Sequence, residues 1–336
     1  MSSNRYPTPL LKKQADPWIY KHLDGYYYFT ASSPEFDRID LRRAKTIEGL
    51  RAADSITIWE KHESGPMSEL IWAPEIHYIS GKWYVYFAAA ATKDPHPEHN
   101  TFQHRMYVLE NGHANPLEGE WAEKGQVKTL WETFALDATV FEHDEKIYYV
   151  WAQKEPNIAG HSNLYISEME NPWTLKGPQI LLTKPEFPWE KIGFLVNEGP
   201  AVLKRNGKIF ITYSASATDE NYSIGLLVAD ADSNLLDRTS WEKSKTPVFR
   251  TCEENKKYGP GHNSFTVSED GTEDILVYHV RDQKNDEDTE DALHDAGRHA
   301  CVQAFEYDKY GYPKFGQPVR NNSELKKLRR CENEKL

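Results

Sequence analysis

Three carboxylic acids, one indole and one imidazole recur at similar places along the sequence. They lie eight or nine residues before short polar turns, at Asp16, Trp72, Asp137, Glu198 and His262. Any single acid in such a place is more often a turn former or a solvated surface group. Asp137 and Glu198, however, lie in otherwise uncharged segments, and a buried carboxylate is costly unless it is paired or used. The recurrence therefore favours acid–base chemistry by groups that share one cavity.

The polar turns define an internal repeat. They lie about sixty residues apart, at Asp24-Gly25, Ser80-Gly81, Asp144-Glu145, Asn206-Gly207 and Asp270-Gly271. An aromatic and β-branched run follows each turn, as at 83–87 and 147–151, which is the signature of a β-hairpin. A hairpin repeat of this length is typical of a β-propeller, whose blades surround a central channel.

Five repeats predict an all-β fold, a five-bladed β-propeller. We expect a single domain over residues 1–336, because no linker-like segment interrupts the repeats. The blades are expected at roughly 14–65, 66–130, 131–185, 190–250 and 258–320. The innermost strand of a blade runs along the channel, so the five recurring residues would converge on the axis.

The charge and hydropathy of the chain narrow the classes of molecule that it is expected to bind. The formal net charge is −12 without a basic stripe, which disfavours nucleic acid, and 39% hydrophobic residues with strongly negative mean hydropathy disfavour a membrane span. A neutral substrate suits this balance. Three widely spaced cysteines and an N-terminal segment without an apolar run lead us to expect a cytoplasmic protein. The sequence leaves open whether the chain forms a homo-oligomer.

Six short strings, in order and at blade spacing, resemble glycoside hydrolase family 43. They are Ala15-Asp16-Pro17, Trp72-Ala73-Pro74-Glu75, Leu136-Asp137-Ala138, Asn197-Glu198-Gly199-Pro200, Gly261-His262-Asn263 and Gly297-Arg298 with Gln303. Each string alone is common, but together they cover nearly the whole chain. The resemblance implies a five-bladed propeller, in agreement with the repeat count.

The chemistry of glycoside hydrolysis suits this set of acids. It needs one carboxylic acid to protonate the leaving oxygen and one carboxylate to attack or to activate water. Carboxylates on blades one and four would lie across the channel with room for water, which favours inversion. The resemblance implies the same roles: Asp16 as general base, Glu198 as general acid, and Asp137 as the group that raises the pKa of Glu198 and orients it.

Five further residues are candidates for the pocket. Trp72 could cover the apolar face of a sugar ring, with Phe36 and Phe194 as weaker candidates for the wall. Arg298 matches the family's arginine, which reaches sugar hydroxyls or the carboxylates; a surface salt bridge is its alternative. His262 is either structural or, as the resemblance implies, close to a central water or calcium ion. No cofactor is expected to be required.

The resemblance is greatest to exo-acting α-L-arabinofuranosidases. It implies release of terminal α-L-arabinofuranose from arabino- or arabinoxylo-oligosaccharides derived from arabinan or hemicellulose. An endo-α-1,5-arabinanase and a β-xylosidase use the same acids and stay open as alternatives. So do two other classes, a non-catalytic propeller that binds sugars or proteins and a retaining, sucrose-acting enzyme. Residues 93–100 would rim the pocket or mediate assembly; the sequence does not decide which.

Overall fold

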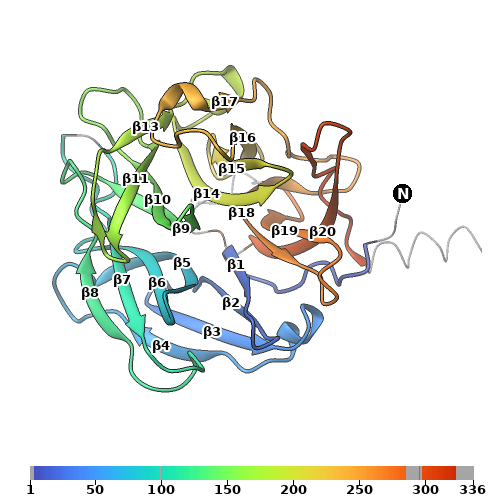
Figure 1. Cartoon of the computed structure of the whole chain (residues 1–336), viewed down its shortest axis with the longest axis horizontal. Helices are drawn as coiled ribbons and strands as arrows, with labels where there is room; N and C mark the ends of the chain where they lie inside the picture. Colours follow the sequence, from blue (N-terminus) through green and yellow to red (C-terminus); the bar gives the residue numbers. More distant parts are fainter. Residues whose placement is uncertain (1–3, 99, 285–294, 296, 323–336) are drawn as a thin grey trace, which may run out of the picture.

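Five antiparallel sheets surround a central axis in the structure, a computed structural model that describes residues 4–98, 100–284, 295 and 297–322 (Figure 1). Sheet one contains β1 (Ala15–Lys21), β2 (Tyr27–Ser32), β3 (Arg38–Ala44) and β4 (Ile56–Glu60). Sheet two contains β5 (Glu69–Ile79), β6 (Lys82–Ala90), β7 (Arg105–Asn111) and β8 (Ala122–Gln126). Sheet three contains β9 (Ala135–His143), β10 (Lys146–Gln153), β11 (Asn163–Asn171), β12 (Thr174–Leu175), β13 (Ile180–Thr183). Sheet four contains β14 (Asn197–Arg205), β15 (Lys208–Ala215), β16 (Ser223–Asp230) and β17 (Glu242–Lys243). Sheet five contains β18 (Tyr258–Val267), β19 (Asp274–Arg281), β20 (His299–Tyr307) and β21 (Pro313–Lys314).

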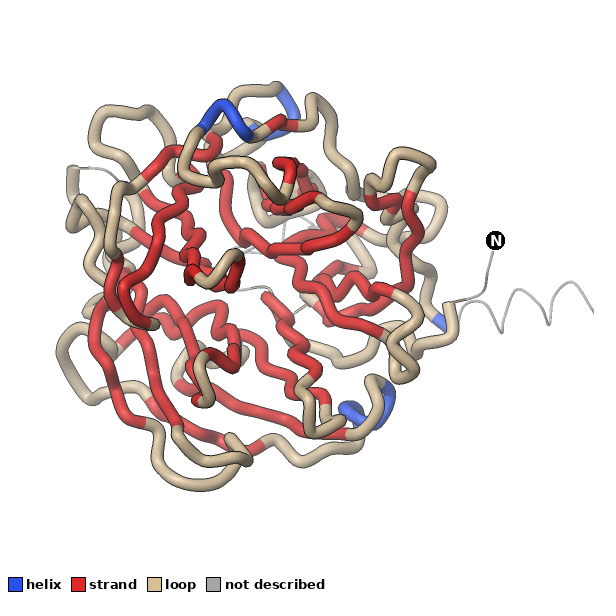
Figure 2. Tube along the Cα trace, viewed as in Figure 1, coloured by secondary structure: helices blue, strands red, loops and turns tan. Residues whose placement is uncertain are grey.

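The prediction of a single-domain, five-bladed β-propeller is confirmed. Each sheet begins at the axis and adds strands outward in chain order, and β1 packs against both β5 and β18, which closes the ring (Figure 2). Short 3-10 helices, at Glu48–Arg51, Pro188–Glu190 and Arg238–Ser240, lie in connections between strands. Within the described part of the chain, no helix has the length and apolar character needed to cross a bilayer.

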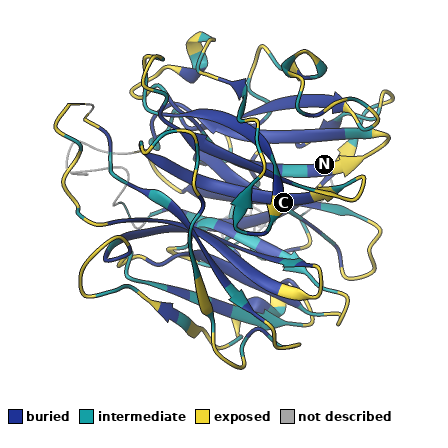
Figure 3. Cartoon of the chain, turned by 60° about the vertical axis from the view of Figure 1, so that its left-hand side comes forward, coloured by how far each residue is buried: buried dark blue, intermediate teal, exposed yellow. Residues whose placement is uncertain are grey.

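The blades are held together by the aromatic runs that follow the turns. The middle strands are buried along almost their whole length, while the loops at their ends are exposed (Figure 3). Trp83, Tyr86 and Trp151 are fully buried between neighbouring sheets. Alternating aromatic and aliphatic side chains can bury both faces of a sheet, as stacked blades require.

Every innermost strand carries a β-bulge near the axis. The pairing with the second strand is interrupted between Ala15 and Trp18, Trp72 and Glu75, Leu136 and Thr139, Glu198 and Ala201, and Gly261 and Ser264. The first residue inside each interruption has a positive φ: Asp16 (56°), Ala73 (46°), Asp137 (52°), Gly199 (55°) and His262 (42°). A bulge bends the strand and re-aims its side chains, here at the mouth of the channel.

In two blades the predicted equivalent position is wrong by one residue. Asp16, Asp137 and His262 do occupy the equivalent position, but Trp72 and Glu198 lie one residue before it. The reason is the length of the hairpin loops. Blades two, three and four have two-residue turns, whereas residues 22–26 and 268–273 form longer loops in blades one and five. A fixed count back from the turn therefore does not reach the same position in every blade.

Candidate active site

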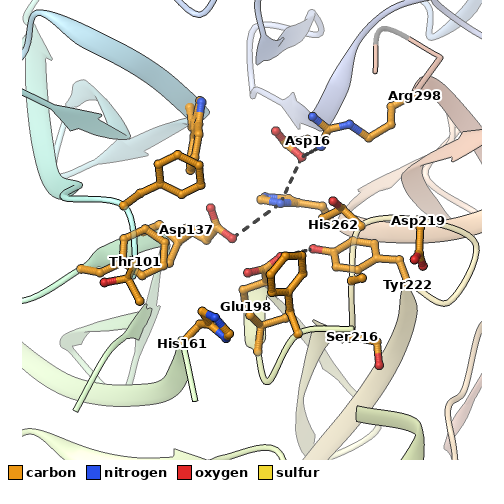
Figure 4. A pocket seen from close by; sticks show the side chains of 18 of the residues that line it. Asp16, Thr101, Asp137, His161, Glu198, Ser216, Asp219, Tyr222, His262 and Arg298 are labelled. Atoms are coloured by element: carbon orange, nitrogen blue, oxygen red, sulfur yellow. Dashed lines mark hydrogen bonds and ion pairs between the residues drawn. The ribbon is translucent and has the colours of Figure 1, made fainter. Parts of the chain in front are cut away.

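A cavity of about 470 Å³ opens at one end of the channel and receives side chains from all five blades. Its wall includes the eight residues that the sequence singled out: Asp16, Phe36, Trp72, Asp137, Phe194, Glu198, His262 and Arg298. The three carboxylic acids, the imidazole and the guanidinium face one another across the centre of the pocket (Figure 4). The structure thus brings together the whole predicted set.

Bulged backbone N–H groups tie four of the five blades to the preceding blade around the ring. A bulge frees an N–H from the sheet ladder, and a buried N–H needs another acceptor. Four of the five bulges find it on a side chain of the preceding blade, through Asp16 N–H to His279 Nδ1 (3.1 Å), Ala73 N–H to Ser32 Oγ (2.8 Å), Gly199 N–H to Asp137 Oδ2 (3.0 Å) and His262 N–H to Ser214 Oγ (2.8 Å). The pocket geometry is therefore fixed by inter-blade hydrogen bonds.

Asp16 is held by groups that favour its ionised form. Ser32 donates a hydrogen bond to Asp16 Oδ2 over 2.6 Å, and Arg298 donates one to Oδ1 over 3.4 Å. His262 Nδ1 also lies 3.3 Å from Oδ1. Burial favours the neutral acid, but His262 and Arg298 outweigh it and lower the pKa of Asp16 well below its usual range. Asp16 is therefore a carboxylate over the physiological range.

Glu198 has the opposite character. Burial raises the pKa of its carboxyl to about 7, the hydrogen bond from Tyr222 opposes this rise, and the Asp16 carboxylate adds to it. Near neutral pH a large share of Glu198 is therefore protonated. Two acids that face one pocket with pKa values moved in opposite directions are the arrangement that acid–base catalysis requires.

Asp137 titrates together with Glu198. Burial, followed by the charges of Glu198 and Asp16, raises the pKa of Asp137 well above its usual range. Two interacting carboxyls of this kind hold their protons as a pair. Burial is the largest cause of the raised pKa of Glu198, and the Asp16 carboxylate adds to it. The role predicted for Asp137 stays a prediction.

Trp72 forms the apolar wall of the pocket. Its indole stacks on His104 with ring centroids 3.8 Å apart, and Phe102 meets it edge-on at 4.9 Å. Phe36 packs against the other side at 5.9 Å. Asn100 and Thr101 also line the cavity, so the loop that the sequence left undecided contributes to the pocket rim. A rigid aromatic surface of this kind suits the apolar face of a sugar ring.

Phe194 lies at the entrance, 51% exposed, with its ring 5.2 Å from that of His161. Its loop is pinned from below, since the amides of Ile192 and Ala217 bond to Ser216 Oγ and to the Ile192 carbonyl, respectively. A hydrogen-bonded loop therefore presents this half-exposed aromatic ring at the wall of the cavity.

His262 lies between two carboxyls, with Nδ1 3.3 Å from Asp16 Oδ1 and 3.7 Å from Asp137 Oδ2. Burial lowers the pKa of His262, and the neighbouring Asp16 carboxylate opposes this effect. Among the described residues, no three His, Cys, Asp or Glu side chains are grouped to hold a metal ion. The calcium ion or water expected beside His262 stays a prediction.

Several pocket residues were missed by the sequence reasoning. Tyr222, Asp219 and Ser216 line the cavity, while His279 Nδ1 lies 3.3 Å from Asp16 Oδ1. They come from loops at the blade ends and from a second strand, where the repeat gives no positional signal. Buried polar residues within an apolar strand, such as His279 between Tyr278 and Val280, could have been flagged for that reason alone.

The sequence matches the model of glycosyl hydrolases family 43 over residues 6–313. The chain belongs to this family. It is accordingly a glycoside hydrolase, and the non-catalytic and sucrose-acting alternatives are set aside. A family-43 protein from Streptomyces chartreusis, named an extracellular exo-α-(1→5)-L-arabinofuranosidase, is 56% identical over 279 residues, 83% of either chain.

Two further relatives carry similar names. A Streptomyces avermitilis protein with the same name is 52% identical over 314 residues, which is 94% of this chain but 64% of that protein. The solved structure of an α-L-arabinofuranosidase from Lactobacillus brevis is 57% identical, has a TM-score of 0.92, and is covered over 98% of its length by 94% of this chain.

The expectation of a cytoplasmic location is wrong. The relatives that are 56% and 52% identical are named extracellular enzymes, which points to secretion. The expectation rested on cysteine spacing and on the character of the first residues. Neither decides location, because a propeller with fully packed blades does not need disulfides in any compartment.

Proposed function

We propose that this family-43 hydrolase releases terminal α-L-arabinofuranose from arabino- or arabinoxylo-oligosaccharides, with inversion at the anomeric carbon. One observation carries the proposal: Asp16 and Glu198 face the same pocket with their pKa values moved in opposite directions. The arabinofuranose specificity is supported by the names of the relatives that share more than half of their aligned residues with this chain.

In the proposed reaction, Glu198 is the general acid. Its proton passes to the glycosidic oxygen as the bond from that oxygen to the anomeric carbon breaks. Asp16 is the general base, which takes a proton from a water molecule as that water attacks the anomeric carbon from the opposite face. Each turnover leaves Glu198 ionised and Asp16 protonated, and exchange with solvent restores both groups.

The remaining polar groups set the charge of the site. Arg298 and His262 keep Asp16 ionised, and we propose that Asp137 supports the protonated form of Glu198 through their shared titration. Both proton transfers use carboxyl groups of the chain, so we propose that no cofactor is required. An ion or water beside His262 would then hold the channel together, with no part in the chemistry.

Exo action is the mode we propose, because the site is a bounded pocket. Trp72 and Phe102 build one wall, and Phe194 stands at the entrance. A terminal sugar can enter such a pocket while the rest of the oligosaccharide extends past Phe194. The word "exo" in the names of the two Streptomyces relatives supports this reading.

The test compares 4-nitrophenyl α-L-arabinofuranoside with the β-D-xyloside and with arabino-oligosaccharides, using wild type and Glu198→Ala. We expect turnover of the arabinofuranoside, release of single arabinose units from the non-reducing end, and loss of that release in the variant. The anomer released first is read by NMR, where inversion gives the β-anomer. Faster turnover of the xyloside, or oligomeric first products, would contradict the proposal.

A further inference from the structure

Tyr222 makes a direct hydrogen bond to the proposed acid. Its hydroxyl donates to Glu198 Oε1 over 2.8 Å, from a side chain that belongs to a buried residue just before β16 (Figure 4). Its amide also bonds to the Asp219 carbonyl, which fixes the backbone at the pocket rim. Tyr222 is therefore part of the site through a hydrogen bond to the acid, and neither as a carboxylic acid nor as an aromatic surface for the sugar.

The ring of Tyr222 is held in one place. It stacks on the His279 ring with centroids 5.6 Å apart and an angle of 7° between the planes. Gly261, the cross-strand partner of His279, also lies against the tyrosine ring, and an added Cβ there would come within 2.2 Å of two Tyr222 ring carbons. The φ of Gly261 is not in the left-handed region, so this glycine makes room for the tyrosine and serves no turn.

The direction of the hydrogen bond follows from charge. Burial, and then the charge of Glu198, raise the pKa of Tyr222 well above its usual value, so its hydroxyl keeps its proton. The hydroxyl therefore donates and Glu198 Oε1 accepts. The acidic proton of Glu198 is then left to the other oxygen, Oε2.

We propose that Tyr222 is a positioning residue for the acid, which occupies Oε1 of Glu198 and so leaves Oε2 as the oxygen that delivers the proton. The inference rests on the proposed function, in which Glu198 is the acid. As the proton leaves Oε2 for the glycosidic oxygen, the carboxylate becomes negative and the bond from Tyr222 becomes charge-assisted. It is thus stronger when the glycosidic bond breaks than in the ground state, as a catalytic contribution requires.

The same contacts link the acid to the base. His279 stacks under Tyr222 and accepts the hydrogen bond from the Asp16 amide. The His279 ring therefore contacts both the tyrosine that bonds to Glu198 and the backbone of Asp16, although the two carboxyls lie on blades four and one. Tyr222 and His279 together fix the position of Glu198 relative to Asp16.

The test is Tyr222→Phe, which keeps the ring and its packing. It is assayed on a series of aryl and alkyl α-L-arabinofuranosides of increasing leaving-group pKa. We expect kcat on the poorest leaving groups and on arabinobiose to fall about tenfold or more, because these depend on the acid. On 4-nitrophenyl arabinofuranoside, whose leaving group hardly needs protonation, the loss should stay within about threefold, with KM little changed.

The pH profile gives a second readout that a structural role would not move. The hydrogen bond from Tyr222 lowers the pKa of Glu198 against the effect of burial. Without the hydroxyl that pKa rises, so the alkaline limb of kcat/KM should shift to higher pH. An unshifted limb together with an equal loss on every leaving group would overturn the inference.

The matched control is Tyr86→Phe, because that buried hydroxyl donates to the Pro172 carbonyl and lies outside the pocket. It should change neither the leaving-group dependence nor the alkaline limb. Failure of the proposed function looks different: wild type would not hydrolyse arabinofuranosides, or Glu198→Ala would still release arabinose from arabino-oligosaccharides at the wild-type rate, and both ideas would fall. If those two behave as proposed and Tyr222→Phe behaves as Tyr86→Phe does, only the inference on Tyr222 is overturned.

Discussion

The Gly199 amide donates a hydrogen bond to Asp137 Oδ2 over 3.0 Å. Gly199 directly follows Glu198, so the strand that carries the proposed acid is tied to a carboxyl of the preceding blade. The φ of Gly199 is +55°, and an added Cβ would meet the His262 ring at 3.2 Å. We propose that Asp137 positions the acid through this backbone contact as well as through charge.

The variant Asp137→Asn separates these two effects. Its amide oxygen can still accept the bond from Gly199, but the shared titration with Glu198 is lost. Under the role proposed for Asp137, the charge that it shares with Glu198 opposes ionisation of the acid, so the pKa of Glu198 should fall in the variant. The alkaline limb of kcat/KM should therefore move to lower pH, with kcat lowered at pH 7. A limb that stays in place would show that burial alone sets the acidity of Glu198.

The wild-type pH profile follows from the two opposite pKa shifts. Glu198 must be protonated to act, and its pKa is about 7, so activity should be lost as the pH rises through about 7. Asp16 must be ionised, and its pKa lies below the ordinary 3.8, so the acid limb should lie below that pH unless the protein unfolds first. Initial rates of kcat/KM between pH 3 and 9 check both limbs. An acid limb above pH 5 in the folded protein would contradict the assignment of Asp16 as the base.

Arg298→Met tests what keeps the base ionised. The Arg298 guanidinium, whose side chain is nearly buried, lies 3.4 Å from Asp16 Oδ1. An opposite charge at this range lowers a carboxyl pKa by about 1–3 units, so its removal should raise the pKa of Asp16 and move the acid limb upward by about one unit or more. The control is Arg205→Met, which breaks an ion pair with Asp274 outside the pocket and should leave the limb unchanged.

The repeat in the sequence was enough to predict the fold and most of the pocket. The turns at 80–81, 144–145 and 206–207 are followed by strands that pair as predicted, because such two-residue turns fix the hairpin register. The count back from the turn failed by one residue at Trp72 and Glu198, because the hairpin loops of blades one and five are longer than the two-residue turns of the other blades.

Tyr222 and His279 could not be reached from the repeat. Tyr222 reaches Glu198 from the loop before β16 of the same blade, whereas His279 on blade five reaches Asp16 on blade one. Gly261 illustrates the limit: the sequence shows a glycine before His262, but only the packed structure shows that a tyrosine ring occupies the place of its missing side chain. Sequence motifs identify the reacting groups, whereas the side chains that position those groups are brought to them by the packing of the blades.

The strand that carries Glu198 is also anchored at its start, by Glu190. This buried carboxylate accepts hydrogen bonds from Asn197 and Tyr213 and lies 2.8 Å from Lys243 Nζ. Glu190→Gln would leave the nearly buried Lys243 ammonium without its main counter-charge, and breaking a buried ion pair costs about 3–5 kcal/mol. Urea unfolding at pH 7 should show a loss of stability in this range.

The control for this prediction is Glu186→Gln. Glu186 lies 3.5 Å from the same Lys243 but its side chain is 46% exposed, so its loss should cost less than about 1 kcal/mol. Since Asn197 bonds to Glu190 and precedes the proposed acid, Glu190→Gln should also lower kcat at temperatures where the variant is still folded. A variant that is as stable as Glu186→Gln would show that Lys243 finds enough compensation elsewhere and that the anchor does not depend on charge.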